Sequence, residues 1–282
     1  MADVKLEDRT FLVTGANSGI GRALVESLAA RGGQVILAGR SPERIARVLE
    51  GIRSRWPQAW TSSLHVDLAD LDSVRRAAGQ ILTADHGVDV LVNNAAVAGT
   101  IGLSRDRYDL TYATNHLGPF LLTLLLLPRL QQSSSARIVN VASAAHLGVR
   151  RIDWSVFARR ALPRISGFQD YATTKLMNVI HAKELARRLE GSSVTTYALH
   201  PGRVASNIYR ALPFPVQWFF KRGNLTCEQG AQTPLYCAAD PRLRGETGRY
   251  YDRCLEAPSN PLADDPALGA ELWARSEAAV TW

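Results

Sequence analysis

The chain has 282 residues, of which 46% are hydrophobic and 21% are charged. These proportions are ordinary for a globular protein and exclude both wholesale disorder and a long coiled coil. The 33 Lys and Arg residues outnumber the 26 Asp and Glu residues, and the resulting net charge of +7 favours anionic partners: nucleotide phosphates, acidic lipid headgroups or nucleic acid. A chain of this length can bury one large core, so we expect a single domain over residues 1–282.

The sequence predicts a cytoplasmic protein without a transmembrane segment. Residues 1–9 carry both charge signs and lack the basic stretch and apolar block of a secretory signal. The most apolar run, residues 117–127, is too short to span a bilayer and predicts a buried or subunit-contact helix. Three cysteines have spacings that fit neither a zinc site nor a disulfide framework, so we expect reduced thiols and no metal: Cys227, Cys237 and Cys254.

Short aliphatic runs alternate along the chain with amphipathic stretches of helical length. The expected strands are residues 10–14, 34–38, 63–66, 88–92, 137–142 and 194–199. The expected helices are residues 19–30, 42–55, 71–84, 108–130 and 171–189. Strands that are apolar on both faces and alternate with helices are typical of a parallel sheet covered on both sides, so the sequence predicts a doubly wound α/β fold.

A glycine-rich turn follows the first expected strand and leads directly into a helix. It reads Thr14-Gly15-Ala16-Asn17-Ser18-Gly19-Ile20-Gly21. Glycines let the backbone turn tightly and let a pyrophosphate approach the amide groups, and the helix N-terminus adds free N–H donors and a favourable dipole. In this setting the turn predicts dinucleotide binding through Gly15, Asn17, Ser18, Gly19, Ile20 and Gly21.

The second expected strand ends at Arg40, where an acidic residue would select NAD by bonding the ribose 2′-hydroxyl. A guanidinium can instead bind a 2′-phosphate, so Arg40 favours NADP(H) over NAD(H), with Arg44 as a second candidate. The alternative is that Arg40 only caps the strand in solvent. Further contacts are expected where the third and fourth strands end: Asp67 and Leu68 at the adenine, and Asn94, Ala95 and Ala96 beside the ribose.

Tyr171 and Lys175 stand four residues apart at the start of an expected helix, which puts them on one face. A nearby cation favours the phenolate of a tyrosine, so the pair can act as acid for carbonyl reduction and as base for alcohol oxidation. Ser143 follows the fifth strand, where its hydroxyl can hold a substrate oxygen. Asn115 lies inside the long fourth helix and can hold a water that relays protons from Lys175.

Taken together, these motifs resemble the short-chain dehydrogenase/reductase superfamily over essentially the whole chain. The resemblance implies a Rossmann fold and a site in which Tyr171 is the catalytic acid/base, Ser143 positions the carbonyl, Lys175 orients the ribose and lowers the tyrosine pKa, and Asn115 completes the relay. It also implies further cofactor contacts near the nicotinamide: Pro201, Gly202, Val204 and Ser206. One departure is Ala96, where the family commonly has Gly.

Within that family the chain is similar to the retinol dehydrogenase-like subgroup, partly because residues 144–170 form an insertion before Tyr171. The resemblance supports NADP(H) as cofactor. The apolar stretch within residues 206–225 predicts a lid over the nicotinamide, which favours a hydrophobic aldehyde, ketone or alcohol as substrate. Plain packing or a membrane-surface contact are the alternatives for this stretch. The arginines of the insertion form either a solvated basic face or a peripheral membrane contact.

Two other functions and the oligomeric state stay open at the level of sequence. A catalytically idle NADP-binding sensor or scaffold would have the same fold, although it would not need the four residues of the catalytic set. A nucleic-acid binder rests on net charge alone, since no motif of that class is present, and we expect no nucleic-acid partner. The resemblance predicts a homodimer or homotetramer through residues 108–130 and 171–189, unless residues 264–282 cover that surface. His146 and His200 are expected to be structural.

Overall fold

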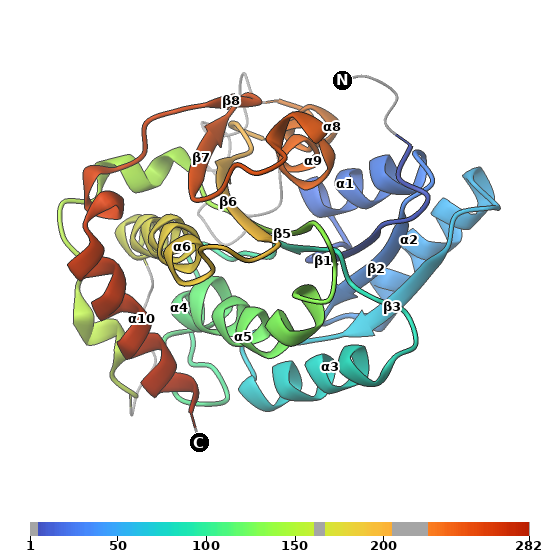
Figure 1. Cartoon of the computed structure of the whole chain (residues 1–282). Coiled ribbons are helices and arrows are strands. Elements are labelled where there is room, and N and C mark those ends of the chain that lie inside the picture. The colour runs from blue at the N-terminus through green and yellow to red at the C-terminus, as the bar shows by residue number, and fades with distance from the viewer. Residues whose placement is uncertain (1–4, 161–166, 205–224, 282) are drawn as a thin grey trace.

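The computed structural model describes residues 5–160, 167–204 and 225–281, which form one eight-stranded sheet flanked by helices (Figure 1). The sheet order is β3-β2-β1-β4-β5-β6-β7-β8, and all neighbours pair in parallel except β7 and β8. The strands are β1 (Thr10–Thr14), β2 (Gln34–Gly39), β3 (Thr61–His65), β4 (Val90–Asn93), β5 (Ala136–Val141), β6 (Val194–His200), β7 (Arg249–Asp252) and β8 (Leu255–Glu256).

Both faces of the sheet are buried. In β1, Leu12 packs into the hydrophobic cluster on one face, while its neighbours Phe11 and Val13 pack into the cluster on the other. One face carries α1 (Gly19–Ala29), α2 (Pro42–Arg55), α8 (Cys227–Gly230) and α9 (Gln232–Ala239). The opposite face carries α3 (Leu71–Thr83), α4 (Leu110–Tyr112), α5 (Gly118–Leu130), α6 (Phe168–Arg188) and α10 (Pro266–Val280). The predicted doubly wound fold is confirmed.

The chain winds in opposite directions from β1, because β2 and β3 lie on one side of it and β4 lies on the other. In open α/β sheets this reversal leaves a crevice at the carboxyl ends of the central strands, where ligands bind. The turn after β1 and the residues after β2 and β4 therefore meet at one edge of the sheet.

The long fourth helix differs from its prediction. Residues 108–130 were expected to form one regular helix, but a π-turn, η1 (Ala113–Leu117), separates α4 from α5. Among the described residues, the stretch Leu110–Leu130 alone is long and apolar enough to cross a bilayer; its window has a mean hydropathy of 1.3 and is 72% buried. This burial agrees with the expected core helix.

The insertion predicted at residues 144–170 contains two 3-10 turns, η2 (Ala144–Gly148) and η3 (Trp154–Phe157), and α6 begins three residues before Tyr171. Residues 161–166 of the insertion lie outside the described residues. So does the predicted lid, residues 206–225, apart from Leu225, and with it Ser206.

Candidate active site

The glycine turn after β1 brings backbone against backbone. Gly15 has φ +68°, and a Cβ at this position would lie 2.9 Å from the Cα of Ala95. A Cβ on Gly21 would lie 2.4 Å from the carbonyl oxygen of Gly15. Gly15 is required both for its left-handed backbone conformation and for its close approach to Ala95. Gly21 is required only because a side chain would collide with the Gly15 carbonyl. The turn thus leaves its amide groups and the start of α1 open to an anion.

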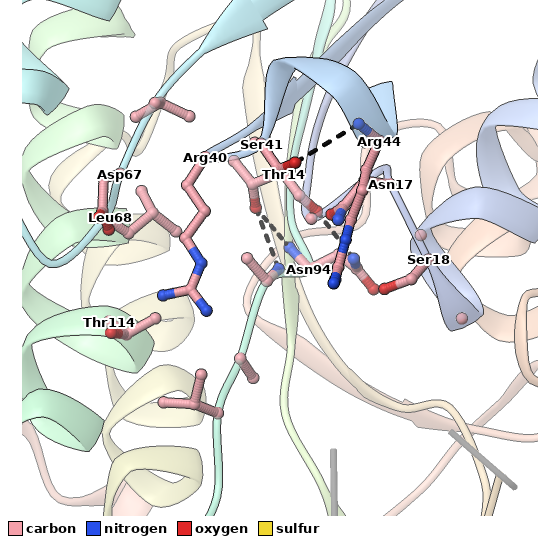
Figure 2. A pocket seen from close by; sticks show the side chains of 18 of the residues that line it. Thr14, Asn17, Ser18, Arg40, Ser41, Arg44, Asp67, Leu68, Asn94 and Thr114 are labelled. Atoms are coloured by element: carbon pink, nitrogen blue, oxygen red, sulfur yellow. Dashed lines mark hydrogen bonds between the residues drawn. The ribbon is translucent and has the colours of Figure 1, made fainter. Parts of the chain in front are cut away.

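The end of β1 is tied to the end of β4 by Thr14 and Asn94. The Thr14 hydroxyl accepts hydrogen bonds from the backbone N–H groups of Asn94 (3.0 Å) and Ala95 (3.1 Å). The Asn94 amide donates to the Thr14 carbonyl oxygen at 2.8 Å (Figure 2). The side chain of Asn94 therefore holds the strand end of β4 against the glycine turn that follows β1.

A cavity of about 670 Å³ lies over this turn. Figure 2 shows the Arg40 and Arg44 side chains extending into it, Arg40 on the side of Asp67 and Thr114, Arg44 on the side of Asn17 and Ser18. Neither guanidinium forms an ion pair within the described part of the chain. Most predicted cofactor contacts line this cavity: Gly15, Asn17, Ser18, Gly19, Ile20, Gly21, Arg40, Asp67, Leu68, Asn94, Ala95 and Ala96.

The sequence reasoning missed several residues of the cavity wall. Ser41 caps α2 by accepting a bond from the Arg44 backbone N–H at 3.4 Å, and it lines the cavity with its two arginine neighbours. Val97, Thr100 and Thr114 line it from the loop after β4 and from η1. Val97 and Thr100 closely follow Ala96, and Thr114 directly precedes Asn115, so their positions in the sequence could have indicated them.

Three predicted catalytic residues meet beyond the cavity, where β5 ends against α6. Lys175 is 2% exposed, and its ammonium donates to the Val141 carbonyl oxygen at 2.7 Å and lies 5.6 Å from the centre of the Tyr171 ring. Ser143 follows Val141 by two residues, and its hydroxyl oxygen accepts a bond from the Ala145 N–H at 3.2 Å. Burial lowers the pKa of Lys175 to about 7. Tyr171 and Lys175 thus form a buried pair, and Ser143 lies two residues beyond the carbonyl that Lys175 bonds.

Asn115 joins the cavity wall to α6. Its amide oxygen accepts from the Val97 N–H at 2.8 Å, and its amide nitrogen donates to the Val97 carbonyl (2.9 Å) and to the Thr174 hydroxyl (3.1 Å). The residue is 1% exposed. Its side chain is therefore bonded to protein groups, and one of them, Thr174, directly precedes Lys175.

The comparisons with known proteins agree with this geometry. A family model described as short chain dehydrogenase matches residues 9–213. The chain belongs to the short chain dehydrogenase family. It is similar to dehydrogenase/reductase SDR family member 13 from Bos taurus, with 40% identity over 96% of this chain and 73% of that protein. It is also similar to retinol dehydrogenase 11 from Homo sapiens, with 36% identity over 96% of this chain and 85% of that protein.

A solved structure shows the same fold. The crystal structure of an uncharacterized protein from Mycobacterium Paratuberculosis has a TM-score of 0.78 and 32% identity, covering 99% of this chain and 96% of that chain. This short chain dehydrogenase is therefore an oxidoreductase of the retinol dehydrogenase-like group, as the sequence motifs predicted.

The site of the dehydrogenase fits a nicotinamide dinucleotide. Its glycine turn leaves space that a Cβ would fill, and the cavity extends from α1 to two guanidinium groups without ionic partners among the described residues. Gly202, with φ +86°, and Val204 follow β6. Val204 pairs with Leu225 in a parallel bridge and packs on Gly230, close to Ile20 at the start of α1. Pro201 precedes them and directly follows β6.

Proposed function

We propose that this dehydrogenase transfers a hydride between NADP(H) and a hydrophobic aldehyde or ketone, or the corresponding alcohol. The observation that carries the proposal is the pairing of two sites along one sheet edge: a phosphate cradle with two arginines, and the group formed by Ser143, Tyr171 and Lys175. The first supports binding of the 2′-phosphate as well as the pyrophosphate, and the second supports proton transfer to oxygen.

The residues divide the work by their positions. NADP(H), when bound, supplies or accepts the hydride. In reduction the Tyr171 hydroxyl donates its proton to the substrate oxygen, and in oxidation its phenolate removes one. Lys175 favours the phenolate because its ammonium lies over the tyrosine ring. The Ser143 oxygen accepts the Ala145 N–H, which leaves the serine hydrogen to be donated to the substrate oxygen.

The remaining predicted residues bind the cofactor or connect its site to the proton donor. We assign Pro201, Gly202, Val204 and Ser206 to the nicotinamide half of the cofactor. Asn115 holds Val97 of the cavity wall against Thr174 of α6, so it keeps the cofactor site and the proton donor in register. A relay of protons away from Lys175 past Asn115 stays part of the proposal.

Two exposed apolar side chains support a hydrophobic substrate. Phe168 is 58% exposed, and its ring centre lies 6.3 Å from that of Tyr171. Leu147 is 53% exposed and follows Ser143 by four residues. Large apolar side chains in solvent beside a reaction site mark surface that a ligand can cover. The names of the retinol dehydrogenase relatives point to the same class of alcohol.

The substitution Tyr171→Phe tests the proposal. It removes only the hydroxyl, so we expect turnover of a panel of carbonyl substrates to fall by about 1,000-fold or more. Turnover is measured as the rate of NADPH oxidation. The Kd for NADPH should stay within about two-fold. Tyr108→Phe is the matched control, because the Tyr108 hydroxyl donates to the Ala279 carbonyl (3.2 Å) away from the site.

Each outcome separates the enzyme from the alternative. Full turnover in Tyr171→Phe would show that the assigned mechanism is wrong. Tight NADPH binding by the wild type without turnover of any carbonyl would favour the idle sensor or scaffold. The cytoplasmic location stays a prediction from the sequence.

A further inference from the structure

Residues 259–264, called here the closing segment, lie between the two elements that carry the catalytic residues. The segment contains the 3-10 turn η6 (Pro261–Asp264). On one side it contacts residues 143–149, called here the serine loop, and on the other it contacts α6. It comes more than a hundred residues after Ser143, so its contacts with the serine loop are long-range.

The Asn260 side chain bonds the serine loop through its amide nitrogen and its own segment through its amide oxygen. Its amide nitrogen donates to the His146 carbonyl oxygen at 2.9 Å and to the Val149 carbonyl oxygen at 2.7 Å. Its amide oxygen accepts from the Leu262 N–H at 3.0 Å and begins η6. The residue is 3% exposed, so these bonds do not compete with water.

His146 continues the connection from Asn260 to Ser143. The imidazole Nδ1 lies 2.6 Å from the Ser143 carbonyl oxygen, and because a carbonyl oxygen only accepts, Nδ1 carries the hydrogen. Nε2 then accepts the backbone N–H of Asn260 at 3.2 Å. The ring is fully buried against Tyr250, with ring centres 4.8 Å apart. One neutral tautomer satisfies both bonds, and burial lowers the pKa of His146 in the same sense.

The other end of the closing segment is bound to α6 through Lys183. Its ammonium donates to the Ser259 hydroxyl at 2.8 Å and forms an ion pair with Asp264. Lys183 lies about two helical turns after Lys175 on the same helix. One short segment therefore fixes the serine loop and the helix of Tyr171 to each other.

We propose that Asn260 and His146 are positioning residues, which hold the Ser143 hydroxyl in place relative to Tyr171 through the closing segment. The inference rests on the proposed function, since it assigns these residues to the reaction of that site. The bonds described within the serine loop are short-range: the Ser143 hydroxyl and carbonyl accept the N–H groups of Ala145 and His146, and the His146 carbonyl accepts that of Val149. A displacement of a catalytic group by about 1 Å can cost about 100-fold in rate.

The substitution Asn260→Asp isolates the two donated bonds. Aspartate keeps the size of the side chain and an oxygen for Leu262, but it replaces the amide donors with a carboxylate oxygen that faces two carbonyls. We expect kcat to fall about 10- to 100-fold while the Kd for NADPH stays within about two-fold. Asp265→Ala is the control: it removes the N-cap of α10 next to the segment, and kcat should stay within about two-fold.

A double-mutant comparison distinguishes positioning from general support of the fold. In a Ser143→Ala background, Asn260→Asp should cause no further loss of kcat, because the group that it positions is gone. His146→Asn keeps an N–H close to the Nδ1 position and should retain more activity than His146→Leu. Hydrogen exchange at the Ala145 amide should be faster in Asn260→Asp and unchanged in Asp265→Ala.

The failure of this inference differs from the failure of the proposed function. If the wild type turns over carbonyls and Tyr171→Phe does not, but Asn260→Asp behaves like Asp265→Ala, the positioning role is wrong and the function stands. Multiplicative losses in Ser143→Ala with Asn260→Asp would also overturn it. A wild type without turnover of any carbonyl would overturn both.

Discussion

At the scale of single residues, the proposed preference for NADP(H) rests on Arg40 and Arg44. Both line the far end of the cavity, and neither has an ionic partner within the ranges that the structure describes. The sequence reasoning found Arg40 because the strand end lacked an acid. The reach of Arg44 into the same cavity depends on the N-cap of α2 at Ser41, which fixes the direction of the helix's first turn.

Replacing Arg40 by alanine should change cofactor preference more than affinity in general. A charge-assisted hydrogen bond contributes about 1.5–3 kcal/mol, so we expect the Kd for NADPH to rise about 10- to 100-fold. The Kd for NADH should change less than about three-fold, since NADH has no 2′-phosphate. Titration of protein fluorescence with both cofactors measures this. Arg47→Ala is the control, because Arg47 is exposed on α2 and does not line the cavity. An equal loss for both cofactors would contradict the assignment.

The local motifs explain why the positions of the proposed catalytic residues in the fold could be predicted. Ser143 stands at a strand end, and Tyr171 and Lys175 share a helix face, so spacing alone brings each into place. Asn260 could not be found in this way, because its partners His146 and Val149 are more than a hundred residues away and asparagine is common in turns.

At the scale of elements, the π-turn in the fourth helix escaped prediction for a simple reason. A π-turn adds one residue to a helical turn without requiring a particular residue type, so the apolar period hardly changes. The consequence is at Asn115, which lies within the π-turn and bonds both Val97 and Thr174. Strand β8 was missed because two residues are too few to show a pattern, and α9 because it contains Pro234.

Helix α10 was recognisable only in part. Asp265 and Pro266 are an N-cap and first-turn pair, but the face that the helix buries depends on its partner. That partner is α6, with Trp273 stacked on His181 and edge-on to Phe120, so α10 covers part of the surface that was expected to serve subunit contacts (Figure 1).

Removing the Trp273 side chain should expose that surface. Trp273 is 7% exposed, and Arg188 lies over its ring at 4.2 Å. Trp→Ala substitutions in cores cost about 3–5 kcal/mol, and we expect a loss of this size in the free energy of unfolding, measured with urea. Size-exclusion chromatography should also show increased self-association of Trp273→Ala. Arg275→Ala, which removes an exposed ion pair with Glu271 and a cation–π contact with Trp154, should change stability by less than about 1 kcal/mol. Comparable losses in the two variants would contradict the packing role of Trp273.

At the scale of the whole molecule, two buried histidines link stability to pH. Burial lowers the pKa of His116 to about 3 and that of His181 to about 4. The His116 Nε2 lies 2.8 Å from the Ser276 hydroxyl of α10, and the two imidazole ring centres are 6.3 Å apart. Both histidines are therefore neutral in the folded protein at pH values where they are protonated in the unfolded chain.

Stability should decline as the pH falls below about 6.5, the unfolded value. The unfolded state then binds protons that the folded state does not, and the loss grows until the pH approaches the folded values of about 3 to 4. At pH 5 the two groups together cost about 4 kcal/mol. Urea unfolding at pH 7 and pH 5 measures the difference, and in His181→Phe it should shrink by about 2 kcal/mol. An unchanged pH dependence in that variant would show that other groups are responsible.

The order of the parts along the chain has a consequence for synthesis on the ribosome. Every residue that lines the nucleotide cavity lies between Thr14 and Thr114, whereas the serine loop is fastened by Asn260. The ribosome synthesises the chain from its amino end. The residues that line the cavity are therefore made long before Asn260 can bond the serine loop. A polypeptide that stops after β6 would contain the residues that line the cavity but would lack the closing segment. If Asn260 has the proposed positioning role, completion of the chain is itself a condition for activity.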